Sequence, residues 1–568
     1  MTLQGSLQIV LVVAILLLLA IPLGNYLYRV FTGKTVWFEG GFAAVERGLY
    51  RLVGVNPSVE MDWKAYLKAL LMVNFVMALF AYLIFRTMGR LPLNPDHIPS
   101  MSWPLAFNTA ASFVSNTDWQ NYAGESQMTI LGQMVAITFL QFTSVVTGLV
   151  AAVAFLRGMT NRKSPNIGNF WVDFIRSITR LFLPLSFLLA IVFVGLGLPQ
   201  TLDGAVTVHA LGGGAQTISR GPVASLEAIK QLGTNGGGYF NANSAHPYED
   251  PSALTTVLEI IAMGLIPTAL VATFGKFIGN RRQAVVLYVF LAAMLLGGAF
   301  FVYGAEVAGN PLLHHLLGIG GPNMEGKEVR FGLPLTGLFT AATTAFTTGA
   351  VNAMHDSLTP LGGMLPLVFM LLNMVFGGVG VGLLNILMFL LITVFIAGLM
   401  VGRTPEIFGK KIEVREVKLA TISMLVHPFL ILGATAVAVA VPAGLAALGN
   451  PGLHGFTEVL YAYSSAAANN GSAFAGLAGN TLFYNLTIGM VILLGRYVSI
   501  IAMFAIAGSL AIKPVTPAGL GTLRTDTFTF GGVFVAVVLV VSALTFFPVL
   551  AIGPVAEHLQ MVAGKLLP

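Results

Sequence analysis

Long apolar segments recur along the whole chain and are separated by short polar stretches. Ten of them approach or exceed the roughly 20 residues that a helix needs to cross a bilayer. We predict spans near residues 6–23, 65–86, 128–156, 174–198, 253–277, 285–303, 365–400, 419–441, 485–510 and 530–552. Four further apolar segments, at 104–114, 223–232, 335–346 and 456–468, are about half as long, so each is predicted to enter the membrane as a half-span and turn back.

Each half-span is followed by a small polar turn. The four turns are Asn116-Thr117-Asp118, Thr234-Asn235-Gly236, Thr347-Thr348-Gly349 and Asn469-Asn470-Gly471. They recur at intervals of roughly 115 residues, and such a long-period repeat indicates one structural unit used several times. The unit reads as span, half-span, polar turn and span.

The repeat defines both the fold class and the domain organisation. We predict an all-α polytopic membrane protein of about ten transmembrane helices, with four membrane–pore–membrane repeats around a central filter. An N-terminal span and loop cover 1–63, the four pore repeats cover 64–163, 164–282, 283–411 and 412–513, and a C-terminal span covers 514–568.

The residues of the turns are those that an ion filter needs. A dehydrated monovalent cation requires a cage of oxygen dipoles, which backbone carbonyls supply when consecutive residues turn them toward one axis. Glycine permits such a turn because it tolerates positive φ, and a helical half-span aims its partly negative C-terminus at the same point. One such turn alone is an ordinary helix cap, but four copies at matching positions favour a cation filter.

Composition and charge agree with a membrane protein. Of the 568 residues, 56% are hydrophobic and only 9% are charged, whereas soluble domains carry about a quarter charged residues. The formal net charge of +6 is the small excess that basic loops on one side of a membrane produce, and it does not indicate nucleic-acid binding. The chain contains no cysteine, which excludes disulfides and cysteine-ligated metals.

The charges of the loops predict the orientation. Loops on one side of the predicted spans hold basic residues such as Arg157, Lys276 and Lys513, while Asp96 and Glu249 lie in loops on the other side. Because basic loops remain on the inner side, both termini and all four polar turns are predicted at the outer face.

A glycine-rich run interrupts the seventh predicted span. Gly377, Gly378, Gly380 and Gly382 lie midway along 365–400, a segment too long for one straight span. Glycine would break or bend the helix there, and a break beneath a filter could act as a gate. The alternative is close helix packing through small residues.

Two polar residues near the turns are further candidates. Arg496 lies within the apolar segment 485–510, and a cation inside the membrane should face the pore or a carboxylate. Beneath a cation filter its charge would repel or meter ions, whereas the alternative is a structural partner for Glu259 or for loop carbonyls. Gln120 follows the first turn closely enough to reach the mouth of the filter.

The sequence offers no motif for catalysis. Gly33-Lys34-Thr35 resembles the end of a phosphate-binding loop, but Tyr28 stands where that motif needs glycine. The Asp-Lys-Thr-Gly run of P-type phosphorylation is absent. His246 and His355 follow two of the turns without a visible cluster of other ligands, so no metal site is expected beyond a cation at the filter. We expect no catalytic residue and no cofactor in this chain.

Three stretches resemble a known family. The runs 108–122, 233–247 and 462–475 are similar to the filter regions of the potassium-binding A subunit of Kdp-type potassium-transporting ATPases, and the resemblance covers essentially the whole chain. It implies the fold of the superfamily of potassium transporters. It also implies that Gly236, Gly349 and Gly471 are the filter glycines, while Asp118 stands where the family more commonly shows Asn.

The resemblance extends to the other candidates and to partners. It implies that Gln120 neighbours the filter, that Arg496 is the pore arginine and that 376–382 is the glycine-rich break. It further implies that K⁺ is the transported substrate, that a separate P-type ATPase (the B subunit) hydrolyses ATP, and that the C subunit and a small F subunit complete a Kdp complex in the bacterial inner membrane. The alternative is a self-contained channel or ion-coupled symporter of the same superfamily.

Overall fold

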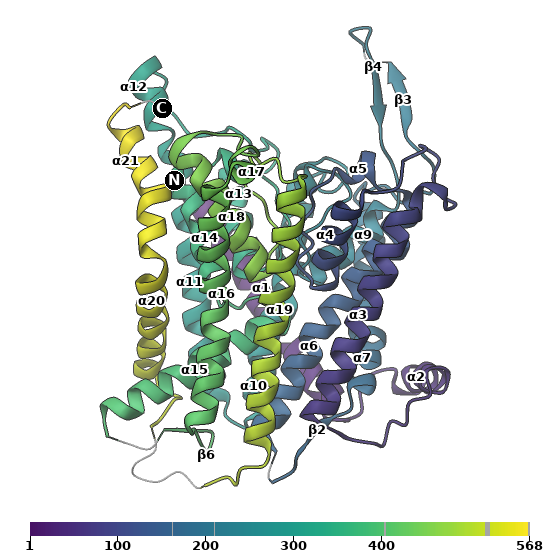
Figure 1. Ribbon diagram of the computed structural model, residues 1–568, viewed down its shortest axis with the longest axis vertical. Coiled ribbons are helices and arrows are strands. Elements are labelled where there is room, and N and C mark those ends of the chain that lie inside the picture. Colours follow the sequence, from purple (N-terminus) through teal and green to yellow (C-terminus); the bar gives the residue numbers. More distant parts are fainter. Residues whose placement is uncertain (162, 210, 403–404, 517–522, 566–568) are drawn as a thin grey trace.

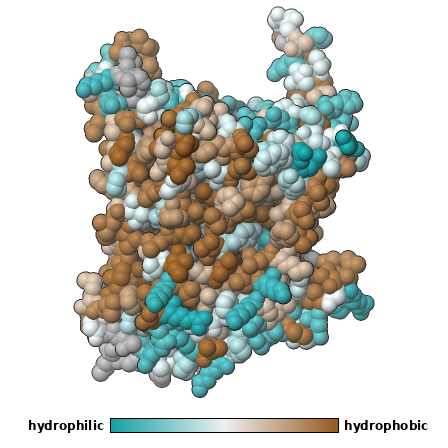
Figure 2. Space-filling view, viewed as in Figure 1, coloured by the Kyte–Doolittle hydropathy of each residue, from teal (hydrophilic) through white to brown (hydrophobic). Residues whose placement is uncertain are grey.

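In a computed structural model, the described residues are 1–568 except 162, 210, 403–404, 517–522 and 566–568. Within them, ten helices are long and apolar enough to cross a membrane, which confirms the predicted number of spans. The ten are Leu3–Phe31, Trp63–Arg90, Gly132–Thr160, Phe170–Gly195, Ala253–Phe277, Arg281–Leu317, Val381–Met400, Val414–Ala440, Leu482–Ala511 and Phe528–Val562. They form an upright bundle (Figure 1), and a hydrophobic band lies between two more polar ends of the visible face (Figure 2).

The helices along these spans carry the following labels. They are α1 (Leu3–Phe31), α3 (Trp63–Thr87), α6 (Phe139–Thr160), α7 (Phe170–Ser177), α8 (Leu183–Gly195), α10 (Ala253–Phe277), α11 (Arg281–Ala308), α15 (Val381–Met400), α16 (Val414–Ala440), α19 (Leu482–Ala511) and α20 (Phe528–Leu550). Shorter helices outside the core of the bundle are α2 (Glu39–Val53), α5 (Gly124–Gln127), α12 (Pro311–Leu317), α17 (Pro442–Leu445) and α21 (Ala556–Val562). The described strands form three antiparallel pairs, which are β1 (Met61–Asp62) with β2 (Asn166–Gly168), β3 (Val206–His209) with β4 (Ala215–Ile218), and β5 (Glu406–Ile407) with β6 (Lys410–Lys411).

Four short helices cover the predicted half-spans. They are α4 (Trp103–Val114), α9 (Val223–Leu232), α13 (Gly332–Ala345) and α18 (Gly452–Ala468). All four lie in the upper half of Figure 1, the half in which both termini also lie. Helices this short cannot cross a bilayer, and their burial within the bundle supplies the protein surroundings that irregular backbone needs at membrane depth.

The seventh predicted span is two helices rather than one. The structure divides 365–400 into α14 (Pro360–Leu372) and α15, with the non-helical segment 373–380 between them. The interruption follows from the backbone, because Asn373, Phe376, Gly377 and Gly380 all have positive φ, between 47° and 79°, which no α-helix contains. Only α15 is long enough to be a candidate span.

The spans differ in how deeply they are buried. In the third span, which contains α6, 89% of the most apolar stretch is buried, against 17% in the last span, which contains α20. A helix that is apolar on all sides and buried on all sides belongs in the centre of a bundle. Two of the four short helices, α4 and α9, contact α6 directly.

Candidate ion filter

Each short helix ends at one of the four polar turns, and the turns meet. We call them loop 1 (116–118), loop 2 (234–236), loop 3 (347–349) and loop 4 (469–471). A Cβ placed on Gly236 would lie 2.7 Å from the carbonyl oxygen of Thr117 and 3.0 Å from that of Asn470. A Cβ on Gly349 would overlap the Asn470 carbonyl, and one on Gly471 would overlap the Thr117 carbonyl. The structure therefore brings all four loops into direct contact.

The four loops share one backbone geometry. Their first residues all lie in the left-handed region, with φ of 63° at Asn116, 50° at Thr234, 50° at Thr347 and 56° at Asn469. In each loop the amide of the middle residue donates to the carbonyl five residues earlier: Thr117 to Ser112 at 3.0 Å, Asn235 to Lys230 at 2.9 Å, Thr348 to Thr343 at 2.7 Å and Asn470 to Ser465 at 2.9 Å. The loops are therefore four copies of one structure at the C-termini of four helices.

The third position of the loops separates them. Gly349 and Gly471 have φ of 92° and 100°, and each amide donates at 3.0 Å to a hydroxyl six residues earlier, on Thr343 and Ser465 respectively. Gly236 does not have positive φ, so its need for glycine comes from the close carbonyls of the neighbouring loops rather than from backbone conformation. Asp118 reaches φ of 57° without being glycine.

Buried oxygens with few hydrogen-bond donors lie in loops 1 and 3 and in the last turn of α4. Within the described residues, the Asp118 carboxylate has Gln141 as its hydrogen-bonding neighbour, and Thr348 Oγ1 and Ser112 Oγ have no partner. Asp118 is 1% exposed. Buried polar atoms are normally paired, so a group of unpaired oxygens beside converging helix C-termini fits a cation.

Side-chain amides join loop 1 to its two neighbours. Asn116 Nδ2 donates to the carbonyls of Gly233 at 3.1 Å and Thr234 at 2.9 Å, which ties loop 1 to loop 2. Asn469 Nδ2 donates to Thr117 Oγ1 at 2.9 Å, which ties loop 4 to loop 1. Both asparagines belong to the loops that they connect.

The other two contacts use asparagines from outside the loops. Asn373 accepts from Thr347 Oγ1 at 3.2 Å and donates to the carbonyl of Ala468 at 3.3 Å, which ties loop 3 to the residue preceding loop 4. Asn243 Nδ2 donates to the carbonyl of Gly236 at 2.8 Å, and its Oδ1 accepts from the Val351 amide at 3.4 Å. Asn243 therefore joins loop 2 to the chain just after loop 3, and four asparagines close the ring.

A buried ion-pair network holds Asn243. Lys230 Nζ donates to Asn243 Oδ1 at 2.8 Å and lies 2.6 Å from a carboxylate oxygen of both Glu227 and Glu249. All three charged side chains are fully buried. Neither Asn243 nor this network was predicted from the sequence, although Glu227 and Lys230 inside an apolar half-span are the signal that points to a role for buried charge.

The segment 373–380 lies against loops 2 and 3. The Gly377 amide donates to the Ala345 carbonyl at 2.9 Å, and the Val379 amide donates to Thr234 Oγ1 at 3.2 Å. A Cβ on Gly378 would lie 3.5 Å from Thr347 Cβ and 3.6 Å from Thr234 Oγ1, which is ordinary van der Waals contact.

The glycines of this segment meet different surroundings. A Cβ on Gly380 would overlap the carbonyl of Gly148 on α6, and one on Gly382 would overlap the carbonyl of Phe376. One on Gly377 would overlap the backbone of Gly382. Close packing thus accounts for Gly377, Gly380 and Gly382, and it leaves Gly378 as the glycine at which an added methyl group would meet only ordinary contacts with loops 2 and 3.

The structure also places Arg496 and Gln120. Arg496 is buried on α19, its guanidinium donates to the Ser144 carbonyl at 3.5 Å, and its Nε has no partner within the described residues. The alternative pairing with Glu259 is wrong, because the Glu259 carboxylate accepts from Gln231 at 2.8 Å, whereas the charged neighbour of Arg496 is Asp118. Gln120 binds both the amide and the carbonyl of Gly238, at 3.0 and 3.1 Å, so it holds the backbone after loop 2.

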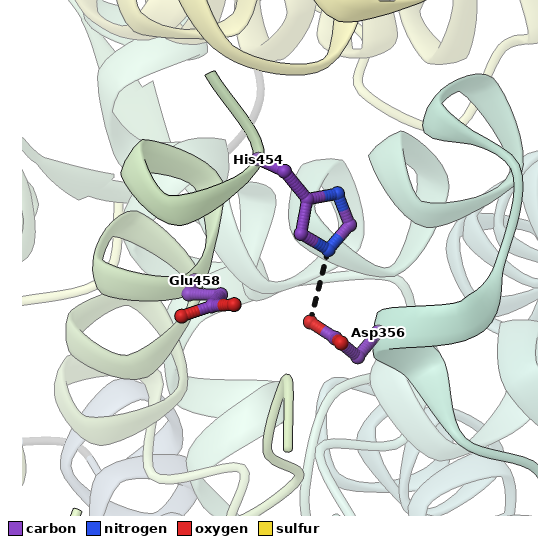
Figure 3. A group of neighbouring side chains, drawn as sticks. All are labelled: Asp356, His454 and Glu458. Atoms are coloured by element: carbon purple, nitrogen blue, oxygen red, sulfur yellow. Dashed lines mark hydrogen bonds and ion pairs between the residues drawn. The ribbon is translucent and has the colours of Figure 1, made fainter. Parts of the chain in front are cut away.

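The two histidines after the turns lie in different surroundings from one another. His246 stacks on Phe240, and buried His355 bonds to the Tyr461 hydroxyl at 2.8 Å. We expected no cluster of ligands near His355, but its neighbour Asp356 lies beside His454 and Glu458 (Figure 3). The sequence did not indicate this group, because its members lie about a hundred positions apart.

These features define a class of protein. A bundle of ten candidate spans, in which four half-helices direct their C-termini at four converging loops, has the architecture of a pore-loop cation transporter. The chain belongs to the KdpA family, described as the potassium-transporting ATPase A subunit, whose model matches residues 10–559. It is therefore a multi-pass membrane protein of that family.

Similar proteins cover the whole chain. A protein of Alicyclobacillus acidocaldarius named the potassium-transporting ATPase potassium-binding subunit is 67% identical over 561 residues, with 99% of this chain and 100% of that one aligned. A protein of the same name from Delftia acidovorans is 52% identical and covers 98% of each chain. In fold, the chain resembles the potassium transporter TrkH from Vibrio parahaemolyticus with a TM-score of 0.50 at 13% identity, over 88% of this chain and 97% of that one.

Proposed function

We propose that this chain is the K⁺-selecting, pore-forming subunit of an ATP-driven potassium uptake complex. The family and the names of the similar proteins support this proposal. The observation that carries it is the convergence of four helix C-termini on loops 1 to 4, with buried oxygens that have no donor.

Selectivity comes from the loop backbones. K⁺ loses its water at the ring and is coordinated by carbonyls and hydroxyls that the left-handed first residues and the glycines turn inward. The ligands come from all three positions of each loop, which are Asn116, Thr117, Asp118, Thr234, Asn235, Gly236, Thr347, Thr348, Gly349, Asn469, Asn470 and Gly471. The asparagine contacts between loops fix the diameter of the cage.

Asp118 adds to the attraction of the ring for K⁺. When a bound cation keeps it ionised, the Asp118 carboxylate, at 1% exposure beside four helix C-termini, adds a negative charge to their partial charges. Removal of such a charge from water is costly unless a cation offsets it, so the ring attracts K⁺ more strongly than carbonyls alone would. We propose Asp118 as a determinant of apparent affinity in this chain.

The residues below the ring control passage. Gly378 and its neighbours Gly377, Gly380 and Gly382 form the gate segment, and Gly378 adjoins Thr234 of loop 2 and Thr347 of loop 3. The Arg496 guanidinium places a fixed positive charge in the same buried region, because its Nη2 lies 3.0 Å from the position of a Cβ on Gly148. This charge raises the energy of K⁺ below the ring and limits downhill leakage.

Partners supply the energy for uptake. ATP hydrolysis belongs to a separate P-type ATPase, the B subunit, and the C subunit and a small F subunit complete the Kdp complex in the inner membrane of a bacterium. Both termini and the ring face outward, as the basic loops at the opposite end predict. In this proposal the chain itself has no catalytic residue and no cofactor, and K⁺ is its substrate.

Co-purification tests the division of labour. The full chain, expressed with its genomic neighbours and isolated in mild detergent, is expected to carry a stoichiometric ATPase whose activity rises with K⁺. Rapid K⁺ uptake by the isolated chain in proteoliposomes, without ATP, would instead support a self-contained channel or symporter.

The Arg496→Gln variant tests the charge below the ring. We expect a protein that assembles normally but leaks K⁺ down its gradient, because the side chain keeps much of its size while its charge is lost. Efflux of ⁸⁶Rb⁺ from vesicles that contain the assembled complex measures the leak. Normal flux and normal affinity would contradict this role.

A further inference from the structure

A histidine and two carboxylates gather between the turn that follows loop 3 and the start of α18. Asp356 lies in the short 3₁₀ turn His355–Ser357 that follows loop 3, and His454 and Glu458 lie one helical turn apart at the start of α18. Their potential ligand atoms lie within 4.8 Å of one another. Figure 3 shows the three side chains converging from two different elements.

A second layer of hydrogen bonds orients this group. His454 Nδ1 lies 2.8 Å from the Glu557 carboxylate on α21, and its Nε2 faces Asp356 Oδ1 at 3.0 Å. The Asn450 amide donates to Glu458 at 2.7 Å and to Asp356 at 3.3 Å. One amide thus holds both carboxylates in position toward the imidazole.

This arrangement matches the ligand chemistry of zinc. Zn²⁺ binds imidazole nitrogen and carboxylate oxygen, and a protein zinc ligand His usually donates its other ring N–H to a carboxylate, as His454 can to Glu557. We propose that Asp356, His454 and Glu458 form a site for a divalent transition metal ion, with Zn²⁺ as the expected ion and Glu557 as the residue that orients His454.

The spacing requires only a small adjustment. Ligand atoms around one tetrahedral zinc lie about 3.3 Å apart, which the pair of His454 and Asp356 already meets at 3.0 Å. The Glu458 carboxylate, which now accepts from Asn450 Nδ2 at 2.7 Å and from the Gly449 amide at 3.1 Å, would exchange one of these bonds for the metal. Asp356, His454 and Glu557 border a cavity of about 220 Å³, which leaves room for a water molecule as the fourth ligand.

The same residues have a second interpretation, in which no metal takes part. Burial lowers the pKa of His454, but hydrogen bonds to Asp356 and Glu557 raise it to about 10. A protonated imidazole between two carboxylates would then balance the charge of the cluster by itself. The two interpretations differ in a measurable way, because only the first predicts stoichiometric metal binding that depends on all three ligands.

A metal at this place would connect three separate parts of the chain. Asp356 follows loop 3, His454 and Glu458 begin the helix that ends at loop 4, and Glu557 belongs to the C-terminal helix α21. The expected consequence is greater stability of the turn after loop 3 and of the start of α18, the helix that ends at loop 4. This inference does not depend on the proposed transport function, since it concerns binding of Zn²⁺ to the folded chain.

Metal content and thermal stability test the proposal together. The full chain, freed of any histidine tag, is stripped with EDTA, incubated with excess Zn²⁺ and desalted. We expect about one bound Zn²⁺ per chain by mass spectrometry, and a rise in the unfolding temperature that follows from binding to the native state alone. Asp356→Asn, His454→Gln and Glu458→Gln should each weaken Zn²⁺ binding by at least about tenfold, and Glu557→Gln by about tenfold.

A matched control separates this site from surface binding. His209→Gln removes an exposed histidine on the β3–β4 hairpin and should retain full binding. X-ray absorption of the loaded wild-type chain should show one imidazole and a shell of oxygens, and this measurement does not need a variant to fold. Absence of Zn²⁺ binding by the wild-type chain, unchanged binding in His454→Gln, or a shell with several imidazoles would each overturn the proposal.

Discussion

An asparagine joins loop 4 to loop 1, and another asparagine joins loop 2 to the chain after loop 3. The two contacts differ in what holds the asparagine in place. Between loops 4 and 1, Asn469 is itself a loop residue and reaches Thr117 at 2.9 Å. Between loops 2 and 3, Asn243 lies seven residues beyond Gly236 and depends on buried Lys230, which in turn needs two carboxylates. The first contact is made by a residue of the loop itself and involves no charge. The second is made by a residue outside the loops that a buried lysine holds in place.

The difference traces to one position in the repeat. Thr343 and Ser465 supply a hydroxyl to the glycine amide of their own loop, and the corresponding residue in repeat 2 is Lys230. With no hydroxyl there, Gly236 lacks positive φ, and its carbonyl is held by Asn243 instead. Copies of one unit can therefore keep the same backbone bond while their side chains take on different tasks.

The largest expected effect comes from removing the charge at the contact between loops 2 and 3. Lys230→Met strands Glu227 and Glu249 in a fully buried place, and loss of one partner of a buried pair costs about 3–5 kcal/mol. We expect little folded protein, as measured by yield and unfolding temperature. Adding Glu249→Gln to Lys230→Met should recover part of the loss, and equal stability of Lys230→Met and the unmodified chain would contradict the network.

Alanine at the three glycines should rank the loops. Gly349→Ala and Gly471→Ala place a Cβ on residues with φ of 92° and 100°, which adds roughly 1–2 kcal/mol of strain to the overlap with a neighbouring carbonyl. Gly236→Ala meets close carbonyls without the φ penalty. K⁺-stimulated ATPase of the assembled complex should lose the most apparent affinity in the first two variants. An unchanged K⁺ response in all three would remove the basis for the filter assignment.

Serine at the two asparagines compares the contacts directly. Asn469→Ser removes two neutral hydrogen bonds, to Thr117 Oγ1 and to the Ile492 carbonyl, each worth about 1 kcal/mol, and K⁺ selectivity over Rb⁺ and Na⁺ should relax slightly. Asn243→Ser also removes a partner of buried Lys230, so its effect should be the larger of the two. Competition assays with each cation measure the selectivity, and equal effects in the two variants would show that the charged support adds nothing.

The smallest change concerns the segment below loops 2 and 3. A methyl group at Gly378 meets only ordinary contacts at 3.5 Å and beyond, so Gly378→Ala should assemble normally and reduce K⁺ flux several-fold while binding at the ring is kept. Gly380→Ala is the matched control, since its φ of 79° and the Gly148 carbonyl predict poor assembly. Normal flux in Gly378→Ala would favour packing alone as the role of the whole segment.

Periodicity made the spans, the half-spans and the four turns predictable. The length of an apolar segment and the spacing of a repeat can both be read along the chain without knowledge of contacts. They therefore indicated the ten spans and located the loops that the structure brings together. The direction in which a side chain points from its helix, and therefore its partner on a distant element, cannot be read along the chain. For that reason the alternative pairing of Arg496 with Glu259 was wrong.

The residues that join the elements were beyond sequence reasoning. Asn243 and Asn373 lie outside the turns, and nothing in their neighbourhood indicates which carbonyl they reach. Asp356 and His454 are 98 positions apart, and only the packing of α18 against α14 and its preceding turn makes them neighbours. In each case the signal is a contact between distant parts of the chain.

The four asparagines that close the ring share a backbone conformation, which limits the residues that can replace them. Asn116, Asn243, Asn373 and Asn469 all have φ between 47° and 63°, a region in which most side chains are strained and which Asn, Asp and Gly tolerate. Gly would keep the backbone and lose the amide, and Asp would keep the shape but replace a donor with an acceptor that faces carbonyls. Thr234 and Thr347 occupy the same region at φ of 50°, so backbone conformation alone does not require asparagine. The amide donor does, because each of the four amides makes a contact between loops, and its loss would open the ring at that point whatever ion the ring selects.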